Sequence, residues 1–308
     1  MDISGIRGCG TALVTPFRAD GSVDENALHA LVHWQVESGV RLLVSCGSTG
    51  EASTLTEEET LAVARMTIST AGDGAFVLVG CTHNSTKEAV WRARRVANLS
   101  GIGGVLTACP YYNKPSQEGL YLHFKAIAEA VAPVPVVLYN VPGRTASNLL
   151  PATVARLAEI PNIVGIKESS GNVAQIAETI ASVPKGFAVL SGDDAYALPT
   201  IEAGAVGLVS VASNVAPELI VEMVDAALAG DKKGAQKIAD QTEDLTRALF
   251  AEPSPGPAKA ILNMMGRING EHLRLPMTPV TSAMREQLKR TADALGLLAE
   301  AEVAVSHN

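Results

Sequence analysis

Lys167 is the residue with the clearest chemical potential in this 308-residue sequence. It follows the apolar run 163–166, which is typical of a buried strand. Burial makes the charged form of a lysine costly, and a neutral amine is a nucleophile whose natural target is a carbonyl carbon. A lysine at a strand end can also extend its ammonium group into water, so this residue alone leaves two interpretations open.

Two further features could bind a substrate that carries carboxylates. In the segment Gly47-Ser48-Thr49-Gly50-Glu51, glycines flank two hydroxyl residues, and such a tight turn has free backbone N–H groups that can hold a carboxylate or a phosphate. An ordinary turn with Ser/Thr capping is the alternative. Arg144 follows a Pro-Gly pair, from which its guanidinium could bind a carboxylate in two places or form a surface ion pair.

Combined, these residues indicate a reaction of a 2-oxo acid. Lys167 would form an imine with the ketone while the turn at Ser48 and Thr49 holds the carboxylate. The protonated imine draws electrons from the adjacent carbon, which loses a proton and becomes an enamine. Tyr139, Ser48 and Tyr112 could relay that proton, although tyrosines more often serve packing. The enamine would attack a second carbonyl compound positioned by Arg144, and this chemistry requires no metal or organic cofactor.

The elements that must position these residues form a repeating pattern of short apolar, β-rich runs separated by helical segments. Continuous apolar character favours parallel strands buried on both faces, and eight such units predict an α/β fold, a (β/α)8 TIM barrel. A doubly wound sheet is the alternative, but no G-x-G-x-x-G follows the first strand. The predicted strands are Gly10–Val14, Val40–Ser45, Phe76–Gly80, Gly104–Ala108, Val134–Tyr139, Ile163–Lys167, Ala188–Ser191 and Gly207–Val211.

The predicted barrel occupies residues 1–230, and residues 231–308 form a C-terminal helical region that packs against it. This region is expected to contain helices over Ala235–Phe250, Lys259–Met265 and Thr281–Ala301. Within the barrel, helix starts are predicted at Asp24, at the capping boxes Thr56/Glu59 and Ser85/Glu88, and at Pro151, Asn172 and Asp193. Strand carboxyl ends carry the active site in such barrels, so all the polar strand ends should surround one opening.

Composition excludes several other classes of protein. The net charge of −8, without a basic cluster to offset it, argues against nucleic-acid binding. No apolar run approaches the roughly 18 residues of a membrane span, and the first residues do not form a secretory signal. The four cysteines lack metal-binding spacing and are expected to be buried thiols in a reducing cytoplasm. His29 and His33 could share a metal on a helix, but suitable carboxylate partners are missing.

Six motifs together make the sequence resemble the dihydrodipicolinate synthase family (4-hydroxy-tetrahydrodipicolinate synthases), within the N-acetylneuraminate lyase superfamily. The resemblance extends from about Gly10 to Pro279. The motifs are Ala12–Phe17, Gly47–Glu51, Tyr111–Tyr121, Tyr139–Thr145, Gly165–Glu168 and Ser191–Asp194. The resemblance implies a Schiff-base condensation of pyruvate with L-aspartate 4-semialdehyde in lysine and diaminopimelate biosynthesis. It also implies a homotetramer, built as a dimer of dimers.

The resemblance also assigns roles to individual residues. It makes Lys167 the imine lysine, Tyr139 the central acid and base, and Ser48 the relay hydroxyl. Tyr112 would complete the relay from the neighbouring subunit. The residues expected to bind substrate are Thr49 beside the pyruvate carboxylate, Arg144 at the semialdehyde, and Gly192 and Val209 through their backbones.

Two departures from the family pattern bear on function. Ser48 replaces the first threonine of the usual Gly-Thr-Thr-Gly-Glu turn, and the resulting sequence is more typical of sialic-acid lyases. Arg144, in contrast, favours the synthases. The stretch 52–60 lacks the histidines of a lysine feedback site, although Asn84, Glu88 and Tyr111 match that site.

Three alternative functions stay open at this point. The first is another aldolase or dehydratase of the superfamily, acting on a sugar acid or 4-hydroxy-2-oxoglutarate. The second is a barrel enzyme that binds pyridoxal phosphate through Lys167, although a phosphate cup and a partner for the pyridine nitrogen are not evident. The third is a non-catalytic binding protein on the same fold.

Overall fold

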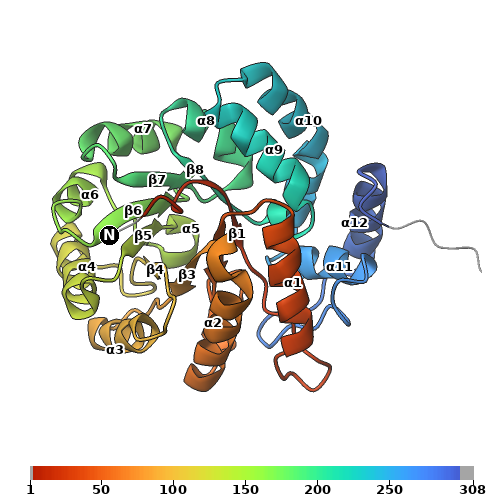
Figure 1. Ribbon diagram of the computed structural model, residues 1–308, viewed down its shortest axis with the longest axis horizontal. Coiled ribbons are helices and arrows are strands. Elements are labelled where there is room, and N and C mark those ends of the chain that lie inside the picture. Colours follow the sequence, from red (N-terminus) through yellow and green to blue (C-terminus); the bar gives the residue numbers. More distant parts are fainter. Residues whose placement is uncertain (1–2, 299–308) are drawn as a thin grey trace, which may run out of the picture.

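A computed structural model describes residues 3–298 as a closed barrel of eight parallel strands surrounded by helices (Figure 1). Neighbours in the ring are neighbours in the sequence, and the last strand pairs with the first. The strands are β1 (Gly8–Ala12), β2 (Leu42–Ser45), β3 (Phe76–Gly80), β4 (Gly104–Ala108), β5 (Val136–Asn140), β6 (Ile163–Glu168), β7 (Ala188–Ser191) and β8 (Gly207–Ser210). The predicted (β/α)8 TIM barrel is therefore confirmed.

The strands are buried on both faces, as their continuous apolar character indicated. The bounds of β3, β4 and β7 agree with the prediction, whereas β1 begins two residues earlier than expected. The reason is the register of ring closure, because Gly8 pairs with Gly207 on β8. Val14, predicted to end the strand, instead donates its backbone N–H to the Asn214 side chain at 3.1 Å.

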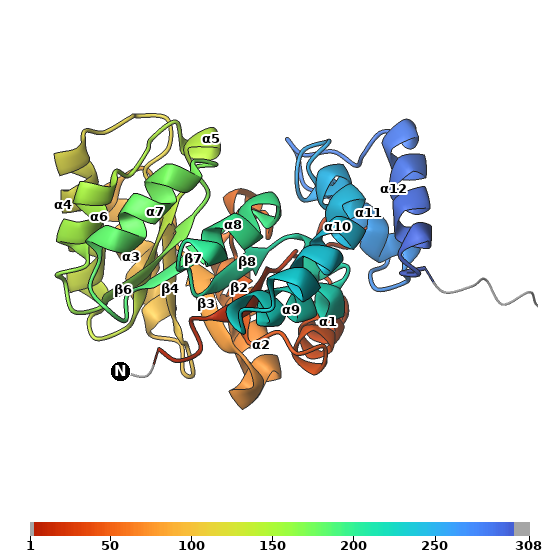
Figure 2. The same cartoon turned by 90° about the horizontal axis from the view of Figure 1, so that it is seen from above.

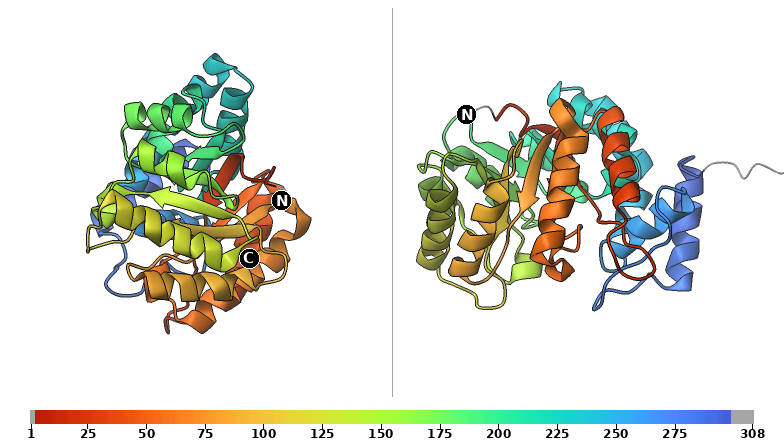
Figure 3. Two further views of the ribbon diagram at one scale, coloured as in Figure 1. Left: turned by 90° about the vertical axis from the view of Figure 1, so that its left-hand side faces the viewer. Right: turned by 60° about the horizontal axis from the view of Figure 1, so that its bottom comes forward.

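Helices cover the outside of the barrel, and Figure 3 shows those of the first half, coloured red to yellow, side by side along it. Their apolar faces pack on the strands, which accounts for most of the core. The helices up to residue 228 are α1 (Glu25–Glu37), α2 (Glu57–Ala71), α3 (Thr86–Ala97), α4 (Gln117–Val131), α5 (Pro142–Thr145), α6 (Pro151–Leu157), α7 (Val173–Ser182), α8 (Ala197–Glu202) and α9 (Pro217–Leu228).

Most of the predicted helix starts are confirmed. The Asp24 carboxylate accepts from the backbone of Ala27, and Thr56 and Glu59 form the complete capping box of α2. Pro151 occupies the first turn of α6, and the Asn172 side chain caps α7. Asp193 caps a short 3-10 helix that leads into α8.

The second capping box was wrong. Ser85 is the residue before α3, but its side chain makes no capping hydrogen bond. Its backbone N–H donates to His83 Nδ1 at 3.0 Å, so the donor that Glu88 would have bound in a capping box is already occupied.

The C-terminal region contains α10 (Lys232–Leu249), α11 (Gly256–Met264) and α12 (Ser282–Ala294). α10 packs on α9, and α12 packs on both α10 and α11. In Figure 2 these helices lie at the right of the view, where α9 is the barrel helix that α10 contacts. The predicted helix over Thr281–Ala301 ends earlier than expected, and residues 299–301 lie outside the described range. The boundary at residue 230 stays a prediction.

Three expectations from composition concern the described residues. All four cysteines there are buried and free. Within residues 3–298, no helix is both long and apolar enough to cross a membrane. The same range contains no group of three His, Cys, Asp or Glu side chains arranged to hold a metal, and His33 Nδ1 lies 3.1 Å from the Glu37 carboxylate.

Acid should destabilise the protein through His123 on α4. This side chain is buried and shares a hydrogen bond of 3.0 Å with Thr86 Oγ1. Burial, with a smaller effect of His83, lowers the pKa of His123 from 6.5 to about 4. The unfolded chain therefore binds this proton below pH 6.5 while the folded chain resists it, so stability falls as the pH drops from 6.5 to 4. The expected loss reaches about 3 kcal/mol at the lower end.

Measuring the free energy of unfolding between pH 7 and pH 4 checks this prediction. The His123→Gln variant should lose part of the pH dependence, and His29→Gln, which changes an exposed histidine, should retain all of it. Equal slopes for all three proteins would contradict the assignment.

Candidate active site

A cavity of about 790 Å³ opens at the carboxyl ends of the barrel strands. Its lining comes from residues far apart in the sequence, which the closed ring brings together. The predicted site residues that line it are Ser48, Thr49, Tyr139, Arg144, Lys167 and Gly192. The polar strand ends therefore surround one opening, as the barrel topology required.

Lys167 and Tyr139 form the centre of this cavity. They are register partners on the neighbouring strands β6 and β5, so their side chains leave the sheet side by side. Both are buried, with 5% and 8% of their surface exposed. Lys167 Nζ lies 4.5 Å from the centre of the Tyr139 ring. The amine thus points into the cavity rather than outward to the helices, and it lies over the Tyr139 ring.

Gly192 provides the space that the Lys167 side chain occupies. A Cβ atom built at Gly192 would lie 2.7 Å from Lys167 Cε and 2.1 Å from Ser169 Oγ, both closer than van der Waals contact allows. Any larger residue at position 192 would displace the lysine. A glycine after β7 is therefore required by close approach rather than by an unusual backbone angle.

Ser169 is a cavity residue that the sequence analysis did not single out. It stands two positions after Lys167, which places both side chains on the same side of the chain. Its hydroxyl is buried and has no hydrogen-bond partner among the described residues. Its position two residues after Lys167 in an extended segment was the feature of the sequence that could have indicated a place beside the lysine.

The turn after β2 offers donors to a carboxylate. Thr49 is buried whereas Ser48 is exposed at the cavity, and the turn closes through a hydrogen bond of 3.1 Å from the Glu51 backbone to the Ser48 carbonyl. Cys46 and Glu51, on either side, both adopt the left-handed backbone region with φ of 53°. This region is costly for residues with side chains, so contacts with the rest of the fold must hold the turn in shape.

Arg144 belongs to α5, the single turn that follows β5. Pro142 starts this turn, and Ala146 ends it in the left-handed region. The guanidinium is exposed and lines the cavity. Among residues 3–298 no carboxylate forms an ion pair with it, so Arg144 is available to bind an acidic substrate.

Two predicted site residues do not line the cavity within one chain. Tyr112 has a φ of 76° and is 87% exposed, whereas its neighbour Tyr111 does line the cavity. Val209 lies inside the barrel, in the apolar cluster below the opening, and Val211 lines the cavity instead. One chain therefore brings together Tyr139 and Ser48 of the predicted relay, but not Tyr112.

Two acids at the strand ends, the buried Glu168 and the half-buried Asp193, shape the surroundings of the lysine. The Asn140 amide donates to both carboxylate oxygens of Glu168 at 3.1 Å, and the Ser170 backbone donates at 2.7 Å. Burial nevertheless raises the pKa of Glu168. Burial also raises the pKa of Asp193, which lines the cavity, while the positive charge of Lys167 opposes this effect. These carboxyl groups restrain the loops around the amine without occupying the cavity centre.

The cavity also reaches residues of α2 and α3 that sequence reasoning did not connect with the site. Arg95 Nε lies 2.6 Å from the Glu57 carboxylate, and Trp91 and Arg92 complete this part of the lining. Their ordinary helical spacing gave no signal that they would share a cavity with Lys167.

A barrel with a buried lysine and tyrosine facing a large cavity at its carboxyl end defines a (β/α)8-barrel enzyme. The sequence matches the dihydrodipicolinate synthetase family over residues 5–295, and the chain belongs to this family.

Individual relatives are similar in sequence or structure to almost the whole chain. The 4-hydroxy-tetrahydrodipicolinate synthase of Koribacter versatilis is 54% identical over 97% of this chain and 99% of its own length. That of Acidobacterium capsulatum is also 54% identical, over 98% and 99%. The chloride-inhibited dihydrodipicolinate synthase of Acinetobacter baumannii, solved in complex with pyruvate, superposes with a TM-score of 0.92 at 42% identity, covering 95% of this chain and all of that one.

Proposed function

We propose that this protein is a lyase that condenses pyruvate with L-aspartate 4-semialdehyde to give 4-hydroxy-tetrahydrodipicolinate, a step of lysine and diaminopimelate biosynthesis. The observation that carries the proposal is the buried amine of Lys167, which faces the cavity 4.5 Å from the Tyr139 ring. The names of the relatives and the pyruvate complex of the Acinetobacter baumannii enzyme support the choice of substrates.

The first half of the reaction forms an imine. After Lys167 loses its proton, its free amine attacks the ketone carbon of pyruvate and yields a carbinolamine, which loses water to give the protonated imine. Tyr139, beside the amine, donates the proton that allows the hydroxyl to leave as water. Thr49 and the surrounding turn bind the pyruvate carboxylate, which orients the ketone toward the lysine.

The second half joins the substrates. The imine withdraws electrons from the pyruvate methyl carbon, which loses a proton and becomes an enamine. The enamine carbon then attacks the aldehyde carbon, and the aldehyde oxygen receives a proton. Arg144 holds the carboxylate of the semialdehyde at the entrance. The amine of Lys167 is released when the amino group of the former semialdehyde replaces it on the imine carbon and closes the ring.

The proton relay of this proposal requires a second copy of the chain. Tyr139 and Ser48 line the cavity, whereas Tyr112 is almost fully exposed and is available to enter a neighbouring subunit. The proposed assembly is a homotetramer built as a dimer of dimers, and the proposed location is the cytoplasm.

Incubating the purified protein with pyruvate and a panel of aldehydes tests this function directly. The panel includes L-aspartate 4-semialdehyde, an N-acetylated sugar and glyoxylate, and product masses identify the acceptor. Preferred turnover of the semialdehyde supports the proposal. Preferred turnover of the sugar or of glyoxylate would assign the chain to another aldolase activity of the superfamily, the alternative that Ser48 raises.

Replacing Arg144 with alanine should impair use of the aldehyde more than use of pyruvate. Loss of a charge-assisted pair with a carboxylate is expected to lower kcat/KM for the semialdehyde by about tenfold to a hundredfold. The KM for pyruvate should change by less than about threefold, because pyruvate binds deeper in the cavity. Steady-state kinetics with each substrate varied in turn provide the measurement.

Arg247→Ala is the matched control, since this arginine is 67% exposed on α10 and, within the part of the chain that the structure describes, pairs only with neighbours on its own helix. It should leave both kinetic constants unchanged. An Arg144→Ala variant with unaltered kinetics toward the semialdehyde would remove the reason for placing an acidic second substrate at this arginine.

A further inference from the structure

Lys259 is a fully buried lysine that the proposed reaction does not use. It lies on α11 with none of its side chain exposed, and its Nζ donates to Glu51 Oε1 at 2.5 Å and to the His272 carbonyl at 2.9 Å. Its ammonium also lies 4.3 Å from the centre of the Phe17 ring. Lys259 itself is not among the residues that line the cavity, so this amine is not a second site for imine formation.

Glu51 connects this lysine to the active-site turn. The backbone N–H of Glu51 closes the turn that contains Ser48 and Thr49, and the Glu51 side chain is only 2% exposed. The second carboxylate oxygen accepts the backbone N–H of Arg274 at 3.1 Å. Both oxygens of Glu51 are therefore bound by groups from the C-terminal region, more than 200 positions later in the sequence.

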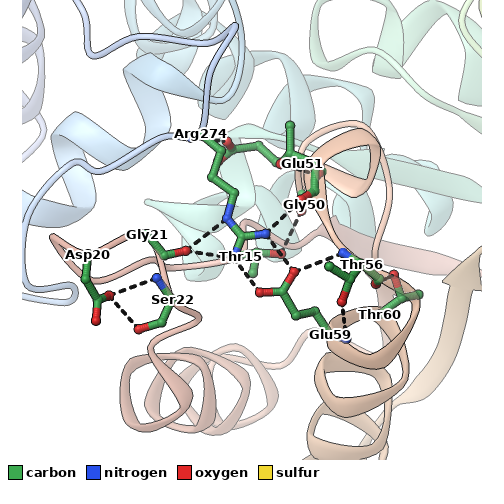
Figure 4. A network of polar contacts seen from close by, with 11 residues as sticks. Thr15, Asp20, Gly21, Ser22, Gly50, Glu51, Thr56, Glu59, Thr60 and Arg274 are labelled. Carbon is green, nitrogen blue, oxygen red and sulfur yellow. Dashed lines mark hydrogen bonds and ion pairs between the residues drawn. The ribbon is translucent and has the colours of Figure 1, made fainter.

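The Arg274 side chain extends the same connection to the segment that follows the turn. Its guanidinium donates to the Thr54 carbonyl at 2.7 Å, to the Gly21 carbonyl at 2.7 and 2.9 Å, and to the Glu59 carboxylate (Figure 4). Glu59 belongs to the capping box that starts α2. The residues on the C-terminal side of the turn are thus fixed as one unit.

The barrel itself also holds both ends of the turn, through Gly50 and through Cys46. Thr15 Oγ1 donates to the Gly50 carbonyl at 2.7 Å. A Cβ at Gly80 would lie 2.1 Å from the Cys46 carbonyl oxygen, so β3 supports the start of the turn by direct contact. The backbone of Glu51 lies in the costly left-handed region, so it needs further contacts to stay there. The hydrogen bonds of its buried carboxylate provide them.

We propose that Glu51 and Lys259 are positioning residues, which hold the Ser48–Thr49 turn in the shape that receives the carboxylate of the 2-oxo acid. The C-terminal helical region then contributes to pyruvate binding without touching pyruvate. This inference rests on the proposed function. The inference predicts a selective effect: loosening the turn should weaken pyruvate binding and leave the aldehyde site at Arg144 intact.

The test uses Lys259→Met, which keeps the chain length and removes the charge, together with Glu51→Gln and the double variant Glu51→Gln/Lys259→Met. The double variant leaves no uncompensated buried charge, so it separates folding from positioning. Steady-state kinetics with each substrate varied, borohydride trapping of the pyruvate adduct and thermal melting are measured for every protein.

We expect the KM for pyruvate to rise about tenfold or more in Lys259→Met and to stay raised in the double variant, while the KM for the semialdehyde changes by less than about twofold. Arg285→Met is the control, since it breaks another ion pair of the C-terminal region, with Glu271, and should not affect pyruvate.

Several outcomes would overturn the proposal. Lower melting temperatures with an unchanged KM for pyruvate would assign the pair to stability alone, as would failure of all three variants to fold. An equal rise in both KM values would indicate general damage to the cavity. If the unaltered protein forms no adduct with pyruvate, the proposed function and this inference fall together.

Discussion

Replacing Lys167 with alanine is expected to abolish the reaction while the barrel still folds. Without the amine no imine can form, so kcat should fall by at least about 10³-fold, and borohydride with pyruvate should add no mass to the protein. The change shortens one side chain that lines a cavity, so circular dichroism and the melting temperature should stay close to those of the unaltered protein. Mass spectrometry after trapping, together with turnover measurements, checks the expectation.

Lys185→Ala is the control for this experiment because its side chain is exposed outside the cavity. It should be trapped with pyruvate as readily as the unaltered protein. Full turnover by Lys167→Ala would reject the imine mechanism, whereas intact binding of pyruvate without any adduct in the unaltered protein would favour a binding protein over an enzyme. A yellow colour that Lys167→Ala abolishes would instead support pyridoxal phosphate.

Gly192→Ala should also slow the reaction strongly, although it adds a single methyl group. That methyl would overlap Lys167 Cε and Ser169 Oγ, so the lysine must move from its place beside Tyr139. A displacement of about 1 Å at a reacting atom can cost about a hundredfold in rate, and we expect a loss of this order in the rate of adduct formation with pyruvate. Single-turnover trapping measures that rate directly.

Gly143→Ala provides a matched control at the same opening. A Cβ at Gly143 would meet nothing within 4 Å, so adduct formation should proceed at the unaltered rate. If Gly192→Ala also formed the adduct at the normal rate, the added methyl would not displace the lysine, and the role assigned to Gly192 would be wrong.

The sequence was sufficient to predict the barrel and the centre of its site, for a physical reason. Strands buried on both faces are recognisable as continuous apolar runs, and parallel closure directs every strand end to one opening. Lys167 and Tyr139 could therefore be placed together although 28 positions separate them, because each lies near the carboxyl end of its strand and the two strands are neighbours.

Features that depend on side-chain contacts were not predictable in this way. Lys259 sits in an apolar helix, and nothing nearby in the sequence indicates that its partner is Glu51, 208 positions earlier. The false capping box at Ser85 has a similar origin, because a local motif was read without the competing acceptor on His83. Tyr112 was predicted as a relay residue, but in one chain its side chain is 87% exposed, and nothing in the local sequence indicates that exposure.

Ring closure has a consequence for how the chain is made. Gly8 and Cys9 pair with Gly207 and Leu208, so during synthesis the first strand keeps one edge unpaired until the eighth strand has left the ribosome. An open edge of this kind can pair with other chains, and contacts so distant in sequence form slowly. Nascent chains interrupted before about residue 210 would therefore be prone to aggregate. Every copy of this protein passes through a stage with the edge of β1 open before the barrel closes around the amine of Lys167.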